Sequence, residues 1–407
     1  MGKSRAAEHQ AFLSWLLKQI KKMKVDALIV AGDIFDTGSP PSYARKMYNR
    51  FVVDMHHTGC QFIVLAGNHD SVATLGESSE LLACLNTHVI SCVNDPDSNA
   101  VFPLKNLKGE VSAVVCAVPF IRPRDVIISQ AGQSGGDKQQ AMQQAISDYY
   151  HRLYKKAVKE RKKLEKKAKT ALPIIATGHL TTVGASTSDS VREIYIGTLD
   201  AFPASGFPPV DYLALGHIHQ SQKVAKTEHL RYSGSPIPLS FDESKMTKSV
   251  LLVDFEKGKF KQAKSLDIPS FQAMKVIKGD LKSIKKQLNQ LAELTNGEHV
   301  WVEILVSSQD YLNDLQTRIE EMIEGLALDV LRLRRERQEK PNSLQQSIEK
   351  ETLNELEVMD VFDRRLSEEN WDKSESQEGK DDKKRVKRLK KNFKQVVAEL
   401  EAGEESL

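Results

Sequence analysis

The chain has 407 residues, of which 40% are hydrophobic and 28% are charged, and its mean hydropathy is -0.41. It is too long for one ordinary domain, so about two or three domains are expected. The formal net charge of +3 does not by itself require a nucleic-acid partner, and no apolar run approaches the roughly 20 residues that cross a bilayer. The four cysteines form no Cys-x-x-Cys pair, so we expect reduced thiols and a cytoplasmic protein.

Helical and strand-like segments alternate through most of the chain. In order, we expect helix 5–23, strand 27–31, a helix from Ser42, strand 61–66, helix 79–85, strand 113–118, helix 137–169, and strands at 173–179, 211–219 and 249–254. Several of these strands are short apolar runs that end at glycine. The alternation predicts a layered α/β fold.

The character of the sequence changes after about residue 270. Strand-like segments at 274–277, 301–306 and 327–333 are separated by helical segments at 281–294 and 309–324. This β-α-β-α-β order predicts a small separate α/β domain. The remainder is charged and helix-like, with one apolar island from Leu353 to Phe362 and a basic stretch at 380–394.

Four of the expected strands end in glycine followed by a residue that can bind a metal ion. These ends read Gly32-Asp33, Gly67-Asn68-His69, Gly178-His179 and Gly216-His217-Ile218-His219. Glycine lets the chain turn sharply and approach a bound ion closely. A single Gly-His pair is most often an ordinary loop, but four such ends favour a metal site. Carboxylate, amide and imidazole ligands together suit manganese, iron, zinc, cobalt or nickel better than calcium.

The spacing of the last two histidines indicates two ions rather than one. His217 and His219 are two residues apart, so on an extended segment their side chains point to opposite sides. Asp33 could bridge two ions with its two oxygens. His69, beside the candidate ligand Asn68, could protonate a leaving oxygen in phosphoester hydrolysis.

The ordered motifs Gly32-Asp-Ile-Phe-Asp36, Gly67-Asn-His-Asp70, Gly178-His179 and Gly216-His-Ile-His219 resemble the signature of calcineurin-like metallophosphoesterases. Within that superfamily the chain resembles the SbcD family of nuclease subunits. The resemblance implies a four-layer metallophosphoesterase β-sandwich flanked by helices, and two divalent ions, usually Mn²⁺. It makes Asp33 the metal bridge and His69 the catalytic group. Asn68, His179 and His217 would hold the second ion, and His219 the first.

The resemblance also implies a domain plan and partners. We expect a nuclease domain over 1–268, truncated at its N-terminus, a capping domain over 269–338, a helical segment over 339–370 that binds an SbcC-type ATPase, and a charged tail over 371–407. The expected activity is hydrolysis of double-stranded DNA ends and hairpins, as a 3′–5′ exonuclease and an endonuclease. The family pattern is a homodimer within a heterotetramer, with no membrane association.

One family motif is missing from the sequence. The family begins with a strand that ends in Asp-x-His, which supplies two ligands of the first ion. The only such triplet here, Asp54-Met55-His56, lies in an amphipathic helix. Its two side chains would be about 200° apart around that helix, which argues against a replacement. We therefore expect an incomplete first metal site and keep two alternatives open: a non-catalytic scaffold subunit, and a metallophosphoesterase acting on small substrates.

Overall fold

The computed structural model describes residues 3–93, 100–127, 135–188, 190–191, 201–295, 297–307 and 315–335, with 366, 385–390 and 392–393. The chain divides into two compact units, Met1–Glu336 and Arg337–Leu407. The first unit carries the α/β fold. The apolar island at 353–362 and most of the charged tail at 371–407 lie outside the described residues. None of the described helices is both long enough and apolar enough to cross a bilayer.

Two sheets face each other in the centre of the first unit. The first is parallel, in the order β1 (Ala27–Val30), β2 (Gln61–Leu65), β3 (Thr87–Ile90). The second has the order β4 (Val101–Lys105), β5 (Val111–Cys116), β6 (Ile174–His179), β7 (Tyr212–Gly216), β9 (Leu230–Tyr232), β8 (Gln222–Lys223). Its four inner strands are parallel, and its edge strands β4 and β8 are antiparallel to their neighbours.

The alternation of side chains along β2 explains how the layers form. Phe62 and Val64 share one apolar cluster with helices α1 (Ala6–Met23) and α2 (Ser42–His56). Ile63 belongs to a second cluster, which the two sheets share with the hairpin β10 (Ser249–Glu256) and β11 (Lys259–Asp267). Since successive side chains of a strand point to opposite faces, one short apolar run supplies both layers.

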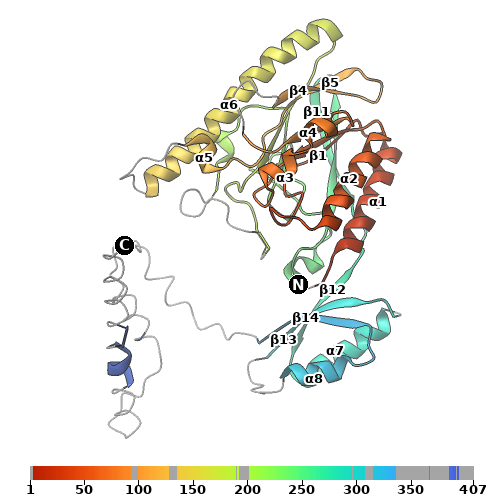
Figure 1. Cartoon of the computed structure of the whole chain (residues 1–407), viewed down its shortest axis with the longest axis vertical. Coiled ribbons are helices and arrows are strands. Elements are labelled where there is room, and N and C mark those ends of the chain that lie inside the picture. The colour runs from red at the N-terminus through yellow and green to blue at the C-terminus, as the bar shows by residue number, and fades with distance from the viewer. Residues whose placement is uncertain are drawn as a thin grey trace. The chain divides into compact units, whose positions relative to one another are not determined.

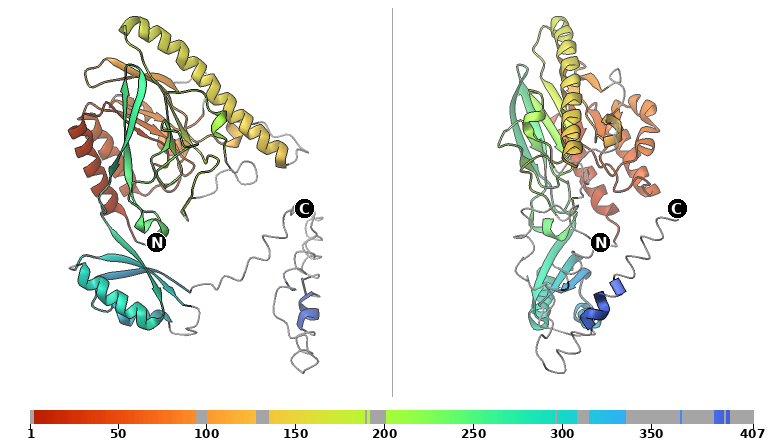
Figure 2. Two further views of the ribbon diagram at one scale, coloured as in Figure 1. Left: turned by 180° about the vertical axis from the view of Figure 1, so that it is seen from behind. Right: turned by 90° about the vertical axis from the view of Figure 1, so that its left-hand side faces the viewer.

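The second sheet repeats this arrangement on its far side. Val114 and Cys116 of β5 pack with Tyr149 and Tyr150 of the long helix α6 (Gly135–Ala168). The result is a helix–sheet–sheet–helix sandwich, with α6 on one side and α1 and α2 on the other (Figures 1 and 2). The expected four-layer α/β architecture is confirmed. Short helices connect the strands: α3 (Val72–Gly76), α4 (Ser79–Ala83), α5 (Pro123–Val126), and the 3₁₀ turns η1 (Ala204–Gly206) and η2 (Phe241–Lys245).

A smaller α/β element follows the hairpin. Strands β12 (Ala273–Gly279), β13 (Val300–Val306) and β14 (Leu328–Arg335) form a parallel sheet, covered by α7 (Leu281–Leu294) and α8 (Leu315–Ile323). Figure 1 shows it at the foot of the sandwich. Phe241 of η2 is buried against Met274 and Trp301 of this sheet. Arg5 also lies over the Trp301 ring, 5.5 Å from its centroid.

Five of the described strands were not expected from the sequence: β3, β4, β8, β9 and β11. Strand β3 is only four residues long, too short to show a period. Strand β4 contains Pro103, which argues against a strand in the interior of a sheet. It is tolerated here because β4 is an edge strand, where a missing N–H donor costs no ladder hydrogen bond.

Candidate metal centre

The glycines at the strand ends leave no room for any side chain. A Cβ atom added to Gly67 would lie 2.1 Å from Asp33 Oδ1, and one added to Gly216 would lie 1.8 Å from the carbonyl oxygen of Ala31. At Gly32 a Cβ would lie 2.1 Å from Nδ1 of His179. Because contacts under 3.0 Å are essentially never seen for real Cβ atoms, only glycine allows these loops to pack together. The close packing brings the side chains at the strand ends to one place.

His179 presents a lone pair to two other acceptors. Its Nδ1 donates to the carbonyl oxygen of Ala31 at 2.7 Å, so the neutral ring carries its lone pair on Nε2. That Nε2 lies 3.2 Å from Asp33 Oδ2 and 2.9 Å from Asn68 Oδ1. Three acceptor atoms therefore face one another. A proton on Nε2 would give the two oxygens a hydrogen-bond donor, and a bound cation would accept a lone pair from all three atoms.

His217 completes the group. Its Nδ1 lies 3.2 Å from Asn68 Oδ1, and its buried Nε2 has no hydrogen-bond partner among the described residues. The backbone φ of His217 is +89°, so the expectation that this segment is extended is wrong. Strand β7 ends at Gly216, and His217 adopts a left-handed conformation directly after it.

The charges of the three buried groups are coupled. Burial alone would raise the pKa of Asp33, but His179 and His69 outweigh it and hold that pKa well below its usual range. Burial acts to lower the pKa of His179, and the Asp33 carboxylate reverses this and raises it. Burial and repulsion from His179 lower the pKa of His217 to about 3. The site is thus built to hold Asp33 ionised and His217 neutral, as metal ligation requires.

The donor set and its geometry fit a divalent cation. One ligand atom each from Asp33, His179 and His217 lies within 4.8 Å of the others, and Asn68 Oδ1 contacts both rings. A carboxylate, two imidazoles and an amide oxygen suit borderline divalent metals. The orphaned Nε2 of His217 is also a polar atom that a ligand would satisfy.

His69 lies on the rim of this group. Its backbone N–H donates to Asp33 Oδ1 at 3.1 Å, and its Nδ1 donates to the carbonyl oxygen of Asp36 at 2.9 Å. Nε2 is then the nitrogen free to exchange a proton. The side chain is 13% exposed, which leaves it accessible to a substrate.

Asp70 holds two of the loops together, a role that the sequence did not reveal. Its carboxylate accepts N–H bonds from Gly67 at 2.8 Å, Phe35 at 2.9 Å and Ile34 at 3.1 Å. Its own backbone carbonyl accepts from Arg122 Nη2 at 3.1 Å. Burial raises the pKa of Asp70, although these three N–H groups oppose the shift. Its position in the Gly67-to-Asp70 motif was the only available signal.

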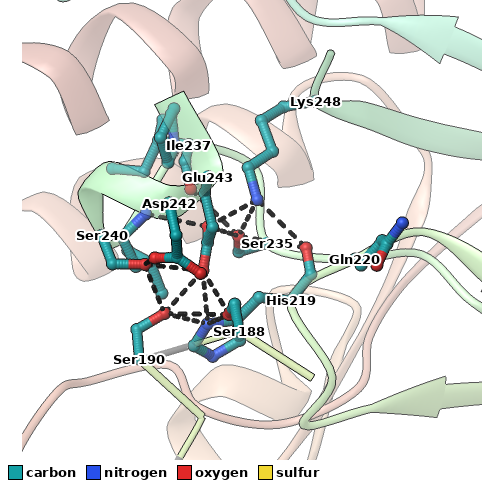
Figure 3. Close-up of polar contacts among 12 residues, drawn as sticks. Ser188, Ser190, His219, Gln220, Ser235, Ile237, Ser240, Asp242, Glu243 and Lys248 are labelled. Atoms are coloured by element: carbon teal, nitrogen blue, oxygen red, sulfur yellow. Dashed lines mark hydrogen bonds and ion pairs between the residues drawn. The ribbon is translucent and has the colours of Figure 1, made fainter. Parts of the chain in front are cut away.

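His219 belongs to a different cluster. Figure 3 shows its ring beside Glu243, Ser188 and Ser190, and its Nδ1 lies 3.1 Å from Glu243 Oε1. Lys248 contacts the other oxygen of Glu243 at 2.6 Å. Burial alone would raise the pKa of Glu243, but hydrogen bonds from His219, Lys248 and the serines hold it well below its usual range. His219 is not among the residues whose ligand atoms lie within 4.8 Å of one another.

The Asp-x-His triplet at 54–56 lies on a helix, with Met55 buried, Asp54 partly exposed and His56 exposed. Asp54 lies on α2, where Arg50 Nε is 3.2 Å from its Oδ1. The structure therefore agrees with the interpretation that this triplet does not replace the missing motif. All four cysteines are free thiols, and Cys60 and Cys116 are buried, as expected.

Comparison with known proteins identifies two regions of the chain. Residues 7–221 match the calcineurin-like phosphoesterase family, and residues 270–370 match the family described as the type 5 capsule protein repressor C-terminal domain. Among solved structures, the AHE enzyme from Alicyclobacillus herbarius aligns with a TM-score of 0.19 at 12% identity, which carries no information about this fold.

Curated relatives give a sharper result. The SbcD component of nuclease SbcCD from Escherichia coli strain K12 is 53% identical over 92% of this chain and 91% of its own. The proteins of the same name from Rhodobacter capsulatus and Bacillus subtilis are 32% and 29% identical, each over 63% of both chains. From the matched length and identity, the chain belongs to the calcineurin-like phosphoesterase family and, within it, to the SbcD group of nuclease subunits.

Proposed function

We propose that this chain is the nuclease subunit of an SbcCD-type complex and hydrolyses phosphodiester bonds in double-stranded DNA ends and hairpins. The convergence of Asp33, Asn68, His179 and His217 is the observation that carries the proposal. The proposed action is a 3′–5′ exonuclease and endonuclease of DNA replication, recombination and repair in the cytoplasm. Family membership, with 53% identity to a relative named as a nuclease subunit, supports the substrate class.

The proposed roles follow from the contacts. Asn68, His179 and His217 would hold one ion, Asp33 would bridge it to a second, and His219 would serve that second ion. Bound divalent ions, with Mn²⁺ the proposed metal, would supply positive charge to the phosphate and lower the pKa of an attacking water.

His69 is the proposed proton donor to the leaving oxygen. The Asp36 carbonyl fixes Nδ1–H, so the ring would exchange its proton through Nε2. The backbone contact to Asp33 keeps His69 beside the proposed ions. A general acid in this position would make the departure of the 3′ or 5′ oxygen less costly.

The other regions of the chain are given the roles that the family resemblance implies. Residues 1–268 would form the nuclease domain, 269–338 the capping domain, 339–370 the segment that binds an SbcC-type ATPase, and 371–407 the charged tail. The match of residues 270–370 to one family model supports a distinct C-terminal region. A homodimer within a heterotetramer is the proposed assembly, with α2 and the segment near 74–86 at the dimer contact.

One observation favours a second candidate, a non-catalytic scaffold subunit. Within the described part of the chain, a single group of three carboxylate and histidine ligand atoms lies within 4.8 Å, and His219 is outside it. A complete two-ion site needs further ligands beside His219. If none is present in the working protein, binding of the ATPase would remain while cleavage would not.

An assay with the full chain and its ATPase partner separates these functions. The substrates are blunt duplex DNA, a DNA hairpin and a small phosphomonoester, each with Mn²⁺ and ATP. Cleavage of DNA that is lost in Asp33→Asn supports the nuclease. Activity on the monoester alone would favour a small-substrate phosphatase. Normal association with the partner and no cleavage of any of the three substrates would favour the scaffold.

The matched control is Asp267→Asn. It makes the same chemical change at an exposed residue of β11, outside the candidate metal centre and the segments proposed for the dimer contact. Its cleavage rate should equal that of the parent chain. Loss of cleavage in both variants would show that the assay reports folding and not the metal centre.

A further inference from the structure

We propose that Glu243 is a positioning residue that fixes the proton of His219 on Nδ1 and so presents the Nε2 lone pair for metal binding. This inference rests on the proposed function, in which His219 is a metal ligand. Glu243 is fully buried, and it comes from the turn η2, while His219 lies in the loop after β7. Figure 3 shows the carboxylate between the imidazole and Lys248.

The environment of Glu243 shows that the carboxylate is an acceptor only. Oε2 accepts from Lys248 Nζ at 2.6 Å and from the backbone N–H of Leu239 at 3.0 Å. Oε1 accepts from Ser188 at 2.6 Å and from Ser190 at 2.5 Å. If Glu243 were protonated, one of its oxygens could no longer accept all of these hydrogen bonds. The buried Lys248 ammonium would also lose its counter-charge, and an unpaired buried charge destabilises the folded protein.

Counting hydroxyl protons settles which ring nitrogen carries hydrogen. Ser190 Oγ lies 2.5 Å from Glu243 Oε1 and 2.7 Å from His219 Nδ1. A hydroxyl has one proton, and Ser190 gives it to the carboxylate, which has none to give. Ser190 can then only accept from His219. Since Glu243 Oε1, at 3.1 Å, also only accepts, Nδ1 must be the N–H.

The consequence is a ring of fixed tautomer. With Nδ1–H directed at Glu243 and Ser190, the lone pair of a neutral His219 lies on Nε2. A carboxylate that receives the non-ligating N–H of a metal-binding histidine also fixes the ring's orientation. Lys248 has a separate role: it neutralises the buried carboxylate and donates to the backbone carbonyl of His219 at 3.1 Å.

The test measures the tautomer directly. The full chain is labelled with ¹⁵N-histidine and freed of metal with a chelator, and the ring nitrogens are observed by two-bond ¹H–¹⁵N correlation. His219→Gln assigns the signal. We expect His219 to be protonated at Nδ1 in the parent chain. In Glu243→Gln the amide NH₂ can donate to Nδ1, so the population with the proton on Nε2 should increase.

Two further variants keep the test independent of folding. Glu243→Gln with Lys248→Met removes the unpaired ammonium that the single change would bury, and it should show the same tautomer change. Ser235→Ala removes a contact of 3.4 Å to Glu243 and one of 2.8 Å to Lys248 without touching the imidazole, and it should leave the tautomer unaltered. An unchanged tautomer in both Glu243 variants, or an equal change in Ser235→Ala, would overturn the proposal.

Metal binding provides a second readout. Calorimetric titration with Mn²⁺ should show unchanged binding at the Asn68, His179 and His217 set in the Glu243 variants, because Glu243 contacts His219 and not these side chains. Weaker binding at that set would mean a general loss of structure and would contradict the inference. If the parent chain shows the Nδ1–H tautomer yet cleaves no DNA, the nuclease proposal fails and the positioning role stands.

Discussion

The Nε2 atom of His179 lies 3.2 Å from Oδ2 of Asp33, at the end of a different sheet. Each residue shifts the pKa of the other toward its charged form, against the effect of burial. This contact between the two sheets is the centre of the candidate metal site. It determines what should happen when either side chain is changed.

Replacement of Asp33 by Asn should weaken Mn²⁺ binding by about 100-fold or more. Loss of a residue that only hydrogen-bonds to a metal ligand already lowers metal affinity about 10–100-fold, and Asp33 is itself a proposed ligand. The same change should lower the pKa of His179, because burial then acts on the imidazole without its carboxylate neighbour. Calorimetric titration measures the first effect. Undiminished Mn²⁺ affinity would remove Asp33 from the site.

Replacement of Gly216 by Ala should destabilise the fold by about 1–3 kcal/mol, a typical cost of overpacking. The added Cβ would lie 1.8 Å from the Ala31 carbonyl oxygen, so β1 and β7 would have to separate. Urea unfolding measures the change. Gly38→Ala is the control, because its Cβ would meet Ser71 at an ordinary 3.5 Å.

Replacement of Asp70 by Asn should cost about 2–4 kcal/mol of stability. The amide has one acceptor oxygen for three backbone N–H donors, and a buried donor without a partner costs about 1–3 kcal/mol. Thermal or urea unfolding tests this, with Asp54→Asn, at a partly exposed residue, as the reference. A loss below 1 kcal/mol would show that the two loops are held by other contacts.

The metal-free protein should lose stability as the pH falls below 6.5, in part through His217. Its folded pKa of about 3 lies below the unfolded value of 6.5, so in this range the unfolded state takes up a proton and the folded state does not. The contribution is full above pH 6.5 and is lost toward pH 3.

The measurement is the free energy of unfolding in chelator at pH 7 and pH 4, for the parent chain and His217→Gln. The parent should lose roughly 3 kcal/mol more than the variant over this interval, at about 1.4 kcal/mol per pH unit below the unfolded pKa. His56→Gln, at an exposed position on α2, should follow the parent. Parallel curves for parent and His217→Gln would contradict the burial of a neutral ring.

Replacement of His69 by Ala should lower DNA cleavage by about 10²–10⁴-fold, the usual contribution of a general acid. Mn²⁺ affinity should stay near that of the parent, because His69 contacts Asp33 through its backbone N–H. A diester with a nitrophenol leaving group needs no proton donor, so its hydrolysis should be largely retained. An equal loss on both substrates would assign His69 a role in binding.

The parts of the site that the sequence predicted share one property. Each lies at the carboxyl end of a strand or within three residues of it: Asp33, Asn68, His179 and His217. Strand β1 pairs in parallel with β2, and β6 pairs in parallel with β7, so in each sheet the two strand ends lie side by side at one edge. The helix α7 was also predicted with its observed limits, because its apolar period is regular and Asp280 caps it.

The parts that the sequence did not predict depend on contacts with no local pattern. Glu243 and Lys248 lie in or beside a turn, and nothing in that segment indicates a buried ion pair beside His219. The conformation of His217 was missed because an extended segment was assumed after β7, whereas its φ is +89°. Strand β4 was missed because Pro103 is acceptable only at a sheet edge, a position that sequence alone cannot assign.

The turn η2 places two very different contacts two residues apart. Phe241 is buried against Met274 and Trp301 of the smaller sheet, and Glu243 holds the ring of His219. A five-residue turn is too short to absorb a displacement at one end without transmitting it to the other. We therefore expect a displacement of the smaller sheet to reach the ring of His219 through this turn. A ligand that displaced Phe241 from its apolar contacts should then change the orientation of His219 without touching that residue.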